Sequence, residues 1–274
     1  MVTIGLDVGG STTKAAAIGE NGTITAVLQV KASDQITSLY GALGRFLHDN
    51  KLSLSDVSEI VLTGVGASFI DCDIFGIPTV RVAEFEAIGK GALMLSGLDK
   101  ALVVSMGTGT AFVQAEHGSY RHIGGSGIGG GTLMGLASKI LHVNNIDAIL
   151  KYAEEGSLEN VDLLISDICR QEISTLPSNA TASNFGKVVS TADKSDFAIG
   201  LINAVVQNAG VLASFACLNS DCKTVVAVGS LACLPQAGEI LDFVGKINGI
   251  QFIIPQNATF STALGAAALA DEIS

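Results

Sequence analysis

IGLDVGGSTTK at residues 4–14 and LVVSMGTGT at residues 102–110 are two apolar stretches that each end in a turn rich in glycine and threonine. When Gly9 is aligned with Gly107, the threonine three residues further on also matches. Each copy then continues through a second apolar stretch to another turn. The repeat predicts one hairpin made twice, and a duplicated hairpin predicts two facing lobes with a nucleotide between them.

The residue types in these turns suit a polyphosphate. Glycine lets the backbone approach an anion closely, successive backbone N–H groups form an anion-binding concavity, and hydroxyls add donors without bulk. Magnesium usually keeps several waters and takes one or two carboxylates, so Asp7, at the end of the first strand, is the candidate Mg²⁺ ligand through water. Lys14 is a candidate phosphate contact. The alternative, turns that merely join strands, is less favoured because two matched copies are present.

Composition limits the classes of partner. The chain has 274 residues, is 48% hydrophobic and 15% charged, and carries a formal net charge of −11. This balance argues against disorder and against a nucleic-acid or anionic-membrane surface, because phosphate backbones require clustered Lys and Arg. A small anion such as ATP is still acceptable, since backbone N–H groups and a bound magnesium ion can neutralise it locally.

The first residues and the cysteines indicate a cytosolic protein. MVTIGLDV runs straight into the first strand, which predicts no signal peptide, and no uninterrupted apolar run reaches the roughly eighteen residues that span a bilayer. The chain has five cysteines and no CxxC pair. That pattern favours reduced thiols over disulfides or a zinc site.

Strands and helices alternate along the chain, which predicts α/β layers. No linker rich in proline or charge marks the boundary between the lobes. We place it near residue 98, which gives an N-terminal lobe over 1–98 and a C-terminal lobe over 99–274. The densest glycine segment, IGGSGIGGGTLMGL at 123–136, opens directly onto a helical pattern. A glycine loop at a helix N-terminus is a candidate anion site.

Phosphoryl transfer also needs a residue that deprotonates or orients the attacking hydroxyl. In AEFEA, Glu84 and Glu86 lie where a short strand passes into a helix, which is where ligands bind in open α/β sheets. The alternative is that both carboxylates only stabilise the helix N-terminus. Position alone does not choose between the two glutamates. His122, just before the glycine segment, is a candidate acceptor contact.

The order of DVGGSTTK, AEFEA, MGTGT, GGSGIGGG, SNFG and VAVGS resembles that of bacterial type II pantothenate kinases over nearly the whole chain. Single motifs are shared across the actin-like ATPase superfamily, which includes sugar kinases. The resemblance implies a duplicated ribonuclease-H-like (actin-like ATPase) α/β fold and a homodimer. It also implies transfer of the ATP γ-phosphate to the primary hydroxyl of pantothenate, the first step of coenzyme A biosynthesis.

The resemblance assigns the proton-acceptor role to Glu84 rather than Glu86. It also implies a set of nucleotide contacts in the three glycine-rich loops, and one contact to the adenosine at the end of the VAVGS strand. These are Asp7, Gly9, Gly10, Ser11, Thr12, Thr13 and Lys14; Gly107, Thr108, Gly109 and Thr110; Gly130, Gly131, Thr132, Leu133 and Met134; and Ser230.

Departures from the family pattern cluster on the acceptor side. His122 stands where the family typically has an arginine that helps hold pantothenate, and Arg121 lies one residue earlier, so both are substrate-binding candidates. A neutral imidazole does not reproduce the donor fork of a guanidinium. Thr262 stands where the family usually has glycine.

These departures motivate two alternative functions. One is a kinase for another small alcohol or an amino sugar. The other is an ATPase activator of a 2-hydroxyacyl-CoA dehydratase, because DVGGSTTK also resembles the start of that family. Such activators hold an iron-sulfur cluster through thiolates. The five cysteines here do not lie in the glycine-flanked central segments where that family carries them.

Overall fold

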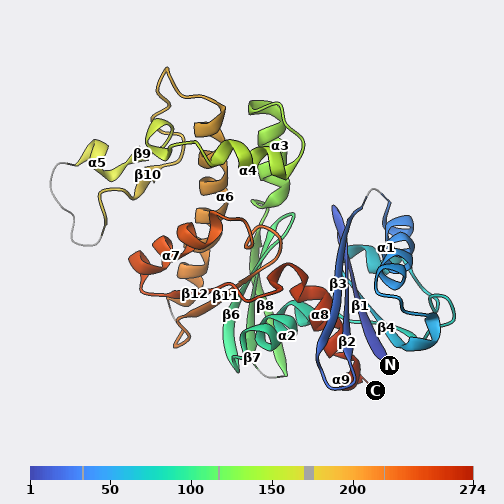
Figure 1. Cartoon of the computed structure of the whole chain (residues 1–274). Coiled ribbons are helices and arrows are strands. Elements are labelled where there is room, and N and C mark those ends of the chain that lie inside the picture. Colours follow the sequence, from blue (N-terminus) through green and yellow to red (C-terminus); the bar gives the residue numbers. More distant parts are fainter. Residues whose placement is uncertain (33, 117, 170–175, 219, 274) are drawn as a thin grey trace.

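The two predicted hairpins each begin a mixed β-sheet, and the two sheets lie in separate lobes of the computed structural model (Figure 1). The structure describes residues 1–32, 34–116, 118–169, 176–218 and 220–273. All structural statements below concern these residues.

The two sheets have the same topology. The first has the order β3-β2-β1-β4-β5 and the second has the order β12-β11-β6-β7-β8. Within each, three antiparallel strands are followed by two parallel ones. The strands are β1 Val2–Val8, β2 Thr12–Gly19, β3 Ile24–Lys31, β4 Val57–Thr63 and β5 Thr79–Arg81, then β6 Lys100–Met106, β7 Thr110–Glu116, β8 Ser119–Ser126, β11 Thr224–Val228 and β12 Gln251–Ile253. The predicted duplicated two-lobe α/β fold is confirmed.

Helices cover both faces of each sheet, as alternating strand and helix patterns predict. They are α1 Gln35–Asp49, α2 Glu84–Ser96, α3 Gly130–Ile140, α4 Ile146–Ala153, α5 Ile165–Ile168, α6 Lys194–Cys217, α7 Ala237–Asn248, α8 Ser261–Ala268 and α9 Ala270–Ile273. Short 3₁₀ turns and a two-stranded ladder complete the described chain: η1 Leu54–Asp56, η2 Val65–Phe69, η3 Leu158–Asn160, η4 Ala258–Phe260, β9 Leu163–Leu164 and β10 Thr181–Ser183.

Local signals in the sequence explain where α1 begins and which face it buries. Asp34 caps the helix, because its carboxylate accepts a hydrogen bond from the Thr37 amide at 2.7 Å. The apolar positions at three- and four-residue spacing, including Leu39, Leu43 and Phe46, are fully buried against the strands of the first sheet.

Two helices, α2 and α8, each pack on the sheet of the other lobe. α2 precedes the second sheet in the chain but packs on it, through Ile88 and Ala92 against Val103 and its neighbours. α8 follows the second sheet but packs on the first, where Ala263 contacts the apolar face of β2. Both helices lie between the two sheets (Figure 1). A boundary near residue 98 therefore separates the sheets but not the helices that cover them.

The second lobe has a larger core, built on the other face of its sheet by α3, α4, α6 and α7. Of the described helices, α6 is long and apolar enough to cross a membrane by length and composition alone, but 61% of its apolar window is buried inside the protein. That burial is typical of a core helix in a globular lobe.

The SNFG motif is anchored to this core by a buried carboxylate. Asp162 is fully buried and accepts hydrogen bonds from the Phe185 amide at 2.9 Å and from the Asn203 side chain at 2.9 Å. Weaker bonds come from Thr181 at 3.2 Å and Asn184 at 3.3 Å. The donors around Asp162 thus tie β10 and the following turn to α6.

Replacing Asp162 with asparagine is expected to destabilise this lobe by about 2–3 kcal/mol, because a neutral amide loses charge-assisted bonds and turns its own NH₂ toward donors. Thermal unfolding measures the loss. Asp242→Asn is the matched control: Asp242 pairs with Lys246 at 3.7 Å on the surface, and exposed pairs contribute little. Equal unfolding temperatures for the two variants would contradict the role given to Asp162.

Candidate active site

The two glycine-threonine turns meet between the lobes. The Ser11 hydroxyl of the β1–β2 turn lies 3.1 Å from the Thr108 hydroxyl of the β6–β7 turn. Each turn is closed by its own backbone: the Gly9 amide donates to the Thr12 carbonyl at 3.0 Å, and the Gly107 amide donates to the Gly109 carbonyl at 2.9 Å. The hydroxyls and glycine backbone of two segments 97 residues apart in the chain thus lie side by side between the lobes.

A buried carboxylate and a buried lysine lie beside the first turn. Asp7 and Lys14 are directly paired across β1 and β2, and both side chains are less than a tenth exposed. Burial raises the pKa of Asp7, and the positive charge of Lys14 acts in the opposite direction. Gly64, at the end of β4, has φ +86°, and a Cβ there would lie 2.7 Å from Asp7 Oδ1. The glycine therefore leaves room for the carboxylate.

Glu84 belongs to the same cluster. It is the first residue of α2, and burial raises its pKa, followed by the negative charge of Asp7, while Lys14 opposes the shift. A carboxylate with a raised pKa is a stronger base than a solvated one. Asp7, Lys14 and Glu84 are thus close enough for their charges to interact, although they come from two strands and a helix.

Glu86 lies elsewhere. Its side chain is exposed, and it acts on Tyr120, where burial is the main cause of a raised pKa and the Glu86 charge adds a smaller upward shift. The two glutamates of AEFEA, which position in the sequence did not separate, therefore face different surroundings. The role of Glu84 as proton acceptor stays a prediction, with its position next to Asp7 in support.

The third glycine loop packs on the second turn. The Gly130 amide donates to the Gly107 carbonyl at 2.8 Å, and the Gly131 amide donates to the Thr108 carbonyl at 2.9 Å. A Cβ on Gly129 would lie 2.6 Å from the Thr108 carbonyl oxygen. These two amides at the start of α3 are therefore engaged by the turn and are not free donors for an anion. The loop's first effect is to hold the second turn in place.

The remaining predicted contacts around this loop differ in exposure. Thr132 is half-buried and its hydroxyl donates to the Gly127 carbonyl at 3.0 Å. Leu133 is buried in the core of the second lobe, and Met134 packs against that core. Ser230 follows β11, where the next amide, that of Leu231, donates to the Met106 carbonyl at 3.1 Å. Ser230 thus lies near the second turn.

Several predicted contacts from the two turns have inward-facing side chains. Thr13 is fully buried, and its hydroxyl has no hydrogen-bond partner in the described structure. Thr110 is buried and donates to the Ile128 carbonyl at 2.8 Å. Gly10 and Thr12, by contrast, belong to the accessible part of the first turn.

The two acceptor-side candidates point in opposite directions. In a strand, successive side chains alternate between faces. His122 pairs with Val113 of β7 and stacks on Phe85 of α2, with ring centroids 3.9 Å apart and planes 8° apart. Arg121 faces the other side of the sheet, where it donates to Gln114 at 2.7 Å. The structure therefore brings His122, and not Arg121, next to the helix turn that carries Glu84.

Two further residues bear on the acceptor side. Thr262 is only 8% exposed at the start of α8, inside the packed region between the lobes. Phe85 was not predicted as a site residue, and its only signal in the sequence is its place between Glu84 and Glu86. Its partner on β8 could not be inferred from that motif, because the stack depends on how α2 packs on the second sheet.

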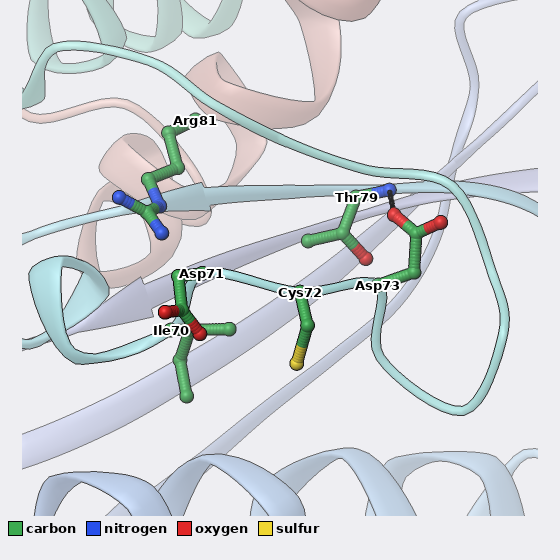
Figure 2. Close-up of a pocket in the computed structure, with 6 residues that line it drawn as sticks. All are labelled: Ile70, Asp71, Cys72, Asp73, Thr79 and Arg81. Carbon is green, nitrogen blue, oxygen red and sulfur yellow. Dashed lines mark hydrogen bonds between the residues drawn. The ribbon is translucent and has the colours of Figure 1, made fainter.

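A surface hollow near β5 is separate from this cluster (Figure 2). Val80 packs toward α2 and α8, so its neighbours Thr79 and Arg81 point to the opposite face of the sheet. The hollow lies on that opposite face, and the Thr79 amide donates to Asp73 there at 3.0 Å. It is lined by Ile70, Asp71, Cys72, Asp73, Thr79 and Arg81.

No group of three or more His, Cys, Asp or Glu side chains within the described ranges could hold a metal ion. A magnesium ion at this site would have at most two such side chains as ligands, and water and phosphate oxygens would supply the rest of its shell. Asp7, buried beside the first turn, fits that arrangement, since Mg²⁺ retains water and takes few protein ligands.

Comparisons with known proteins identify relatives of this chain. Type II pantothenate kinase from Staphylococcus haemolyticus (strain JCSC1435) is 26% identical over 228 residues, covering 78% of this chain and 84% of the relative. Type II pantothenate kinase from Bacillus cereus (strain AH820) is 28% identical over 218 residues, covering 74% and 75%. The resemblance seen in the motifs is confirmed.

Solved structures show the same fold at lower identity. An activator of the 2-hydroxyisocaproyl-CoA dehydratase from Clostridium difficile with bound ADPNP has a TM-score of 0.72 at 18% identity and covers 99% of this chain and 95% of its own. A ROK family glucokinase from Streptomyces griseus in complex with glucose and AMPPNP has a TM-score of 0.62 at 14% identity, with 99% and 100% covered. A model of the Fumble family matches residues 100–239, just over half of the sequence. The chain belongs to the Fumble family.

Proposed function

We propose that this protein is an ATP-dependent kinase that phosphorylates pantothenate on its primary hydroxyl. The observation that carries the proposal is the position of Glu84, half-buried beside Asp7 and Lys14 where the two glycine-threonine turns meet. The names of the relatives, type II pantothenate kinase, support the acceptor.

In this mechanism the turns and Lys14 hold the phosphates of ATP, and Glu84 accepts the proton of the acceptor hydroxyl. The hydroxyl oxygen attacks the γ-phosphorus, the bond to the bridging oxygen breaks, and ADP leaves. Positioning and electrostatic stabilisation supply most of the rate in such transfers. A magnesium ion near Asp7, when bound, neutralises charge on the phosphates.

We also propose that the protein is a cytosolic homodimer. Its molar mass in solution, measured by light scattering during size-exclusion chromatography, tests the dimer.

A coupled enzyme assay that measures the rate of ADP release tests the proposed acceptor. Pantothenate is expected to stimulate ADP release from ATP and magnesium, whereas glucose and N-acetylglucosamine are expected to leave the basal rate unchanged. Turnover that no pantothenate concentration stimulates would contradict the proposed acceptor. Stimulation by an amino sugar or another small alcohol, without stimulation by pantothenate, would favour the second candidate. That candidate is a kinase for another small alcohol or an amino sugar, and His122 in place of an arginine motivates it.

The activator hypothesis is less well supported. The likeness to a dehydratase activator, at 18% identity, shows the fold alone. Cys217 is buried in the core of the second lobe, where burial and then Cys222 raise the pKa of its thiol. A brown, iron-containing preparation purified without oxygen would revive this hypothesis.

A further inference from the structure

The start of α2, which carries Glu84, has no side-chain cap. Its N-cap residue is Ala83, which makes no side-chain hydrogen bond to the first amides. A Ser, Thr, Asp or Asn side chain at this position typically stabilises a helix by about 1 kcal/mol relative to alanine, because it binds an otherwise unpaired amide of the first turn. Something other than a cap therefore has to hold the turn that presents Glu84.

Strand β8 provides two contacts to α2 that are matched in spacing. Phe85 and Gly89 lie four residues apart and so on one face of the helix, while Tyr120 and His122 lie two residues apart and so on one face of the strand. The Tyr120 ring sits against Gly89, where a Cβ would lie 2.4 Å from it. His122 stacks on Phe85 one helical turn earlier. The rise over four helical residues, about 6 Å, is close to that over two strand residues.

The His122 contact uses the face of the imidazole. The planes of the two rings are 8° apart, which leaves both nitrogen atoms at the edge of the stack. Within the described chain, neither nitrogen makes a hydrogen bond. His122 itself is exposed, and Phe85 is half-buried beneath it. The contact to α2 is therefore one of shape and stacking, and it falls on the residue next to Glu84.

We propose that His122 is a positioning residue: its ring, stacked on Phe85, fixes the uncapped first turn of α2 and with it the Glu84 carboxylate. This inference rests on the proposed kinase function for its kinetic consequences. This role of His122 requires no direct hydrogen bond to the acceptor. Since a shift of about 1 Å in a catalytic group costs up to about 100-fold in rate, loosening this turn lowers turnover more than binding.

Two substitutions separate stacking from a polar contact. His122→Ala removes the ring, and kcat is expected to fall about 10-fold to 100-fold while the KM for acceptor changes little. His122→Phe keeps a flat ring without nitrogens, and it is expected to restore most of the kcat lost in the alanine variant. If the phenylalanine variant is as slow as the alanine variant, or if both mainly raise the acceptor KM, His122 contacts the substrate and the proposal is wrong.

A second readout does not depend on the acceptor. Hydrogen-deuterium exchange of the peptide that covers residues 84–88 is expected to speed up in His122→Ala and to return toward the wild-type rate in His122→Phe. Exchange in α6 serves as the internal control for global stability. Unchanged exchange at 84–88 in His122→Ala would overturn the proposal even if the protein phosphorylates another acceptor. Loss of pantothenate turnover in the wild type, with exchange as expected, would count against the proposed function alone.

Discussion

Glu84→Gln is expected to lower kcat for phosphoryl transfer by about 10²–10⁴-fold, because a neutral amide cannot accept the hydroxyl proton. The isosteric change leaves the two turns and Lys14 in place. The dissociation constant for a non-hydrolysable ATP analogue, measured by calorimetry, is therefore expected to stay near the wild-type value. The repulsion between Asp7 and Glu84, which contributes to the raised pKa of Glu84 in the wild type, is absent from this variant.

Glu86→Gln is the matched control for this prediction. It removes the same charge from the same helix turn, but its side chain is exposed and lies toward Tyr120. Turnover close to that of the wild type is expected. Equal losses in the two variants would mean that both carboxylates act through the stability of α2, and Glu84 would lose its special role.

Gly265→Ala is expected to destabilise the protein by about 3 kcal/mol or more, with a fall of about 6–12 °C in Tm. The reason is the close crossing of α2 and α8 between the lobes. A Cβ at Gly265 would lie 1.9 Å from the Ala87 carbonyl oxygen and 2.5 Å from the Gly91 amide nitrogen. Both are backbone atoms of α2, so the clash cannot be relieved by a rotamer change.

Gly44→Ala on α1 tests the same substitution without the clash. Gly44 is exposed, and nothing lies within 4 Å of the position that a Cβ would take there. A gain of about 0.5–1 kcal/mol is expected from helix propensity. Similar melting temperatures for the Gly265 and Gly44 variants would show that the two helices do not cross as closely as described.

The parts of the fold with local signals could be predicted from the sequence. The paired turns around Gly9 and Gly107 carry their own glycine and threonine pattern, and α1 has a cap at Asp34 and a clear helical period. Such signals depend on residues near one another in the chain. The glycine loop at 123–136 also marked the start of α3 correctly.

The exchange of α2 and α8 could not be predicted in this way. It depends on packing between segments about 170 residues apart, and small residues such as Gly91 and Gly265 have no local pattern that identifies their partner. The same limit applies to His122 and Arg121. Alternation in a strand predicts that they face opposite sides, but the register of β8, with its irregularity near Val113, decides which one meets Phe85.

Transfer of phosphate from ATP to the primary hydroxyl of pantothenate is tested by identifying the products. Mass spectrometry and phosphorus NMR identify them after incubation of the protein with ATP, magnesium and pantothenate. We expect a phosphomonoester on the primary hydroxyl of pantothenate, formed in equal amount with ADP and lost in Glu84→Gln. ADP and inorganic phosphate with unmodified pantothenate would contradict it.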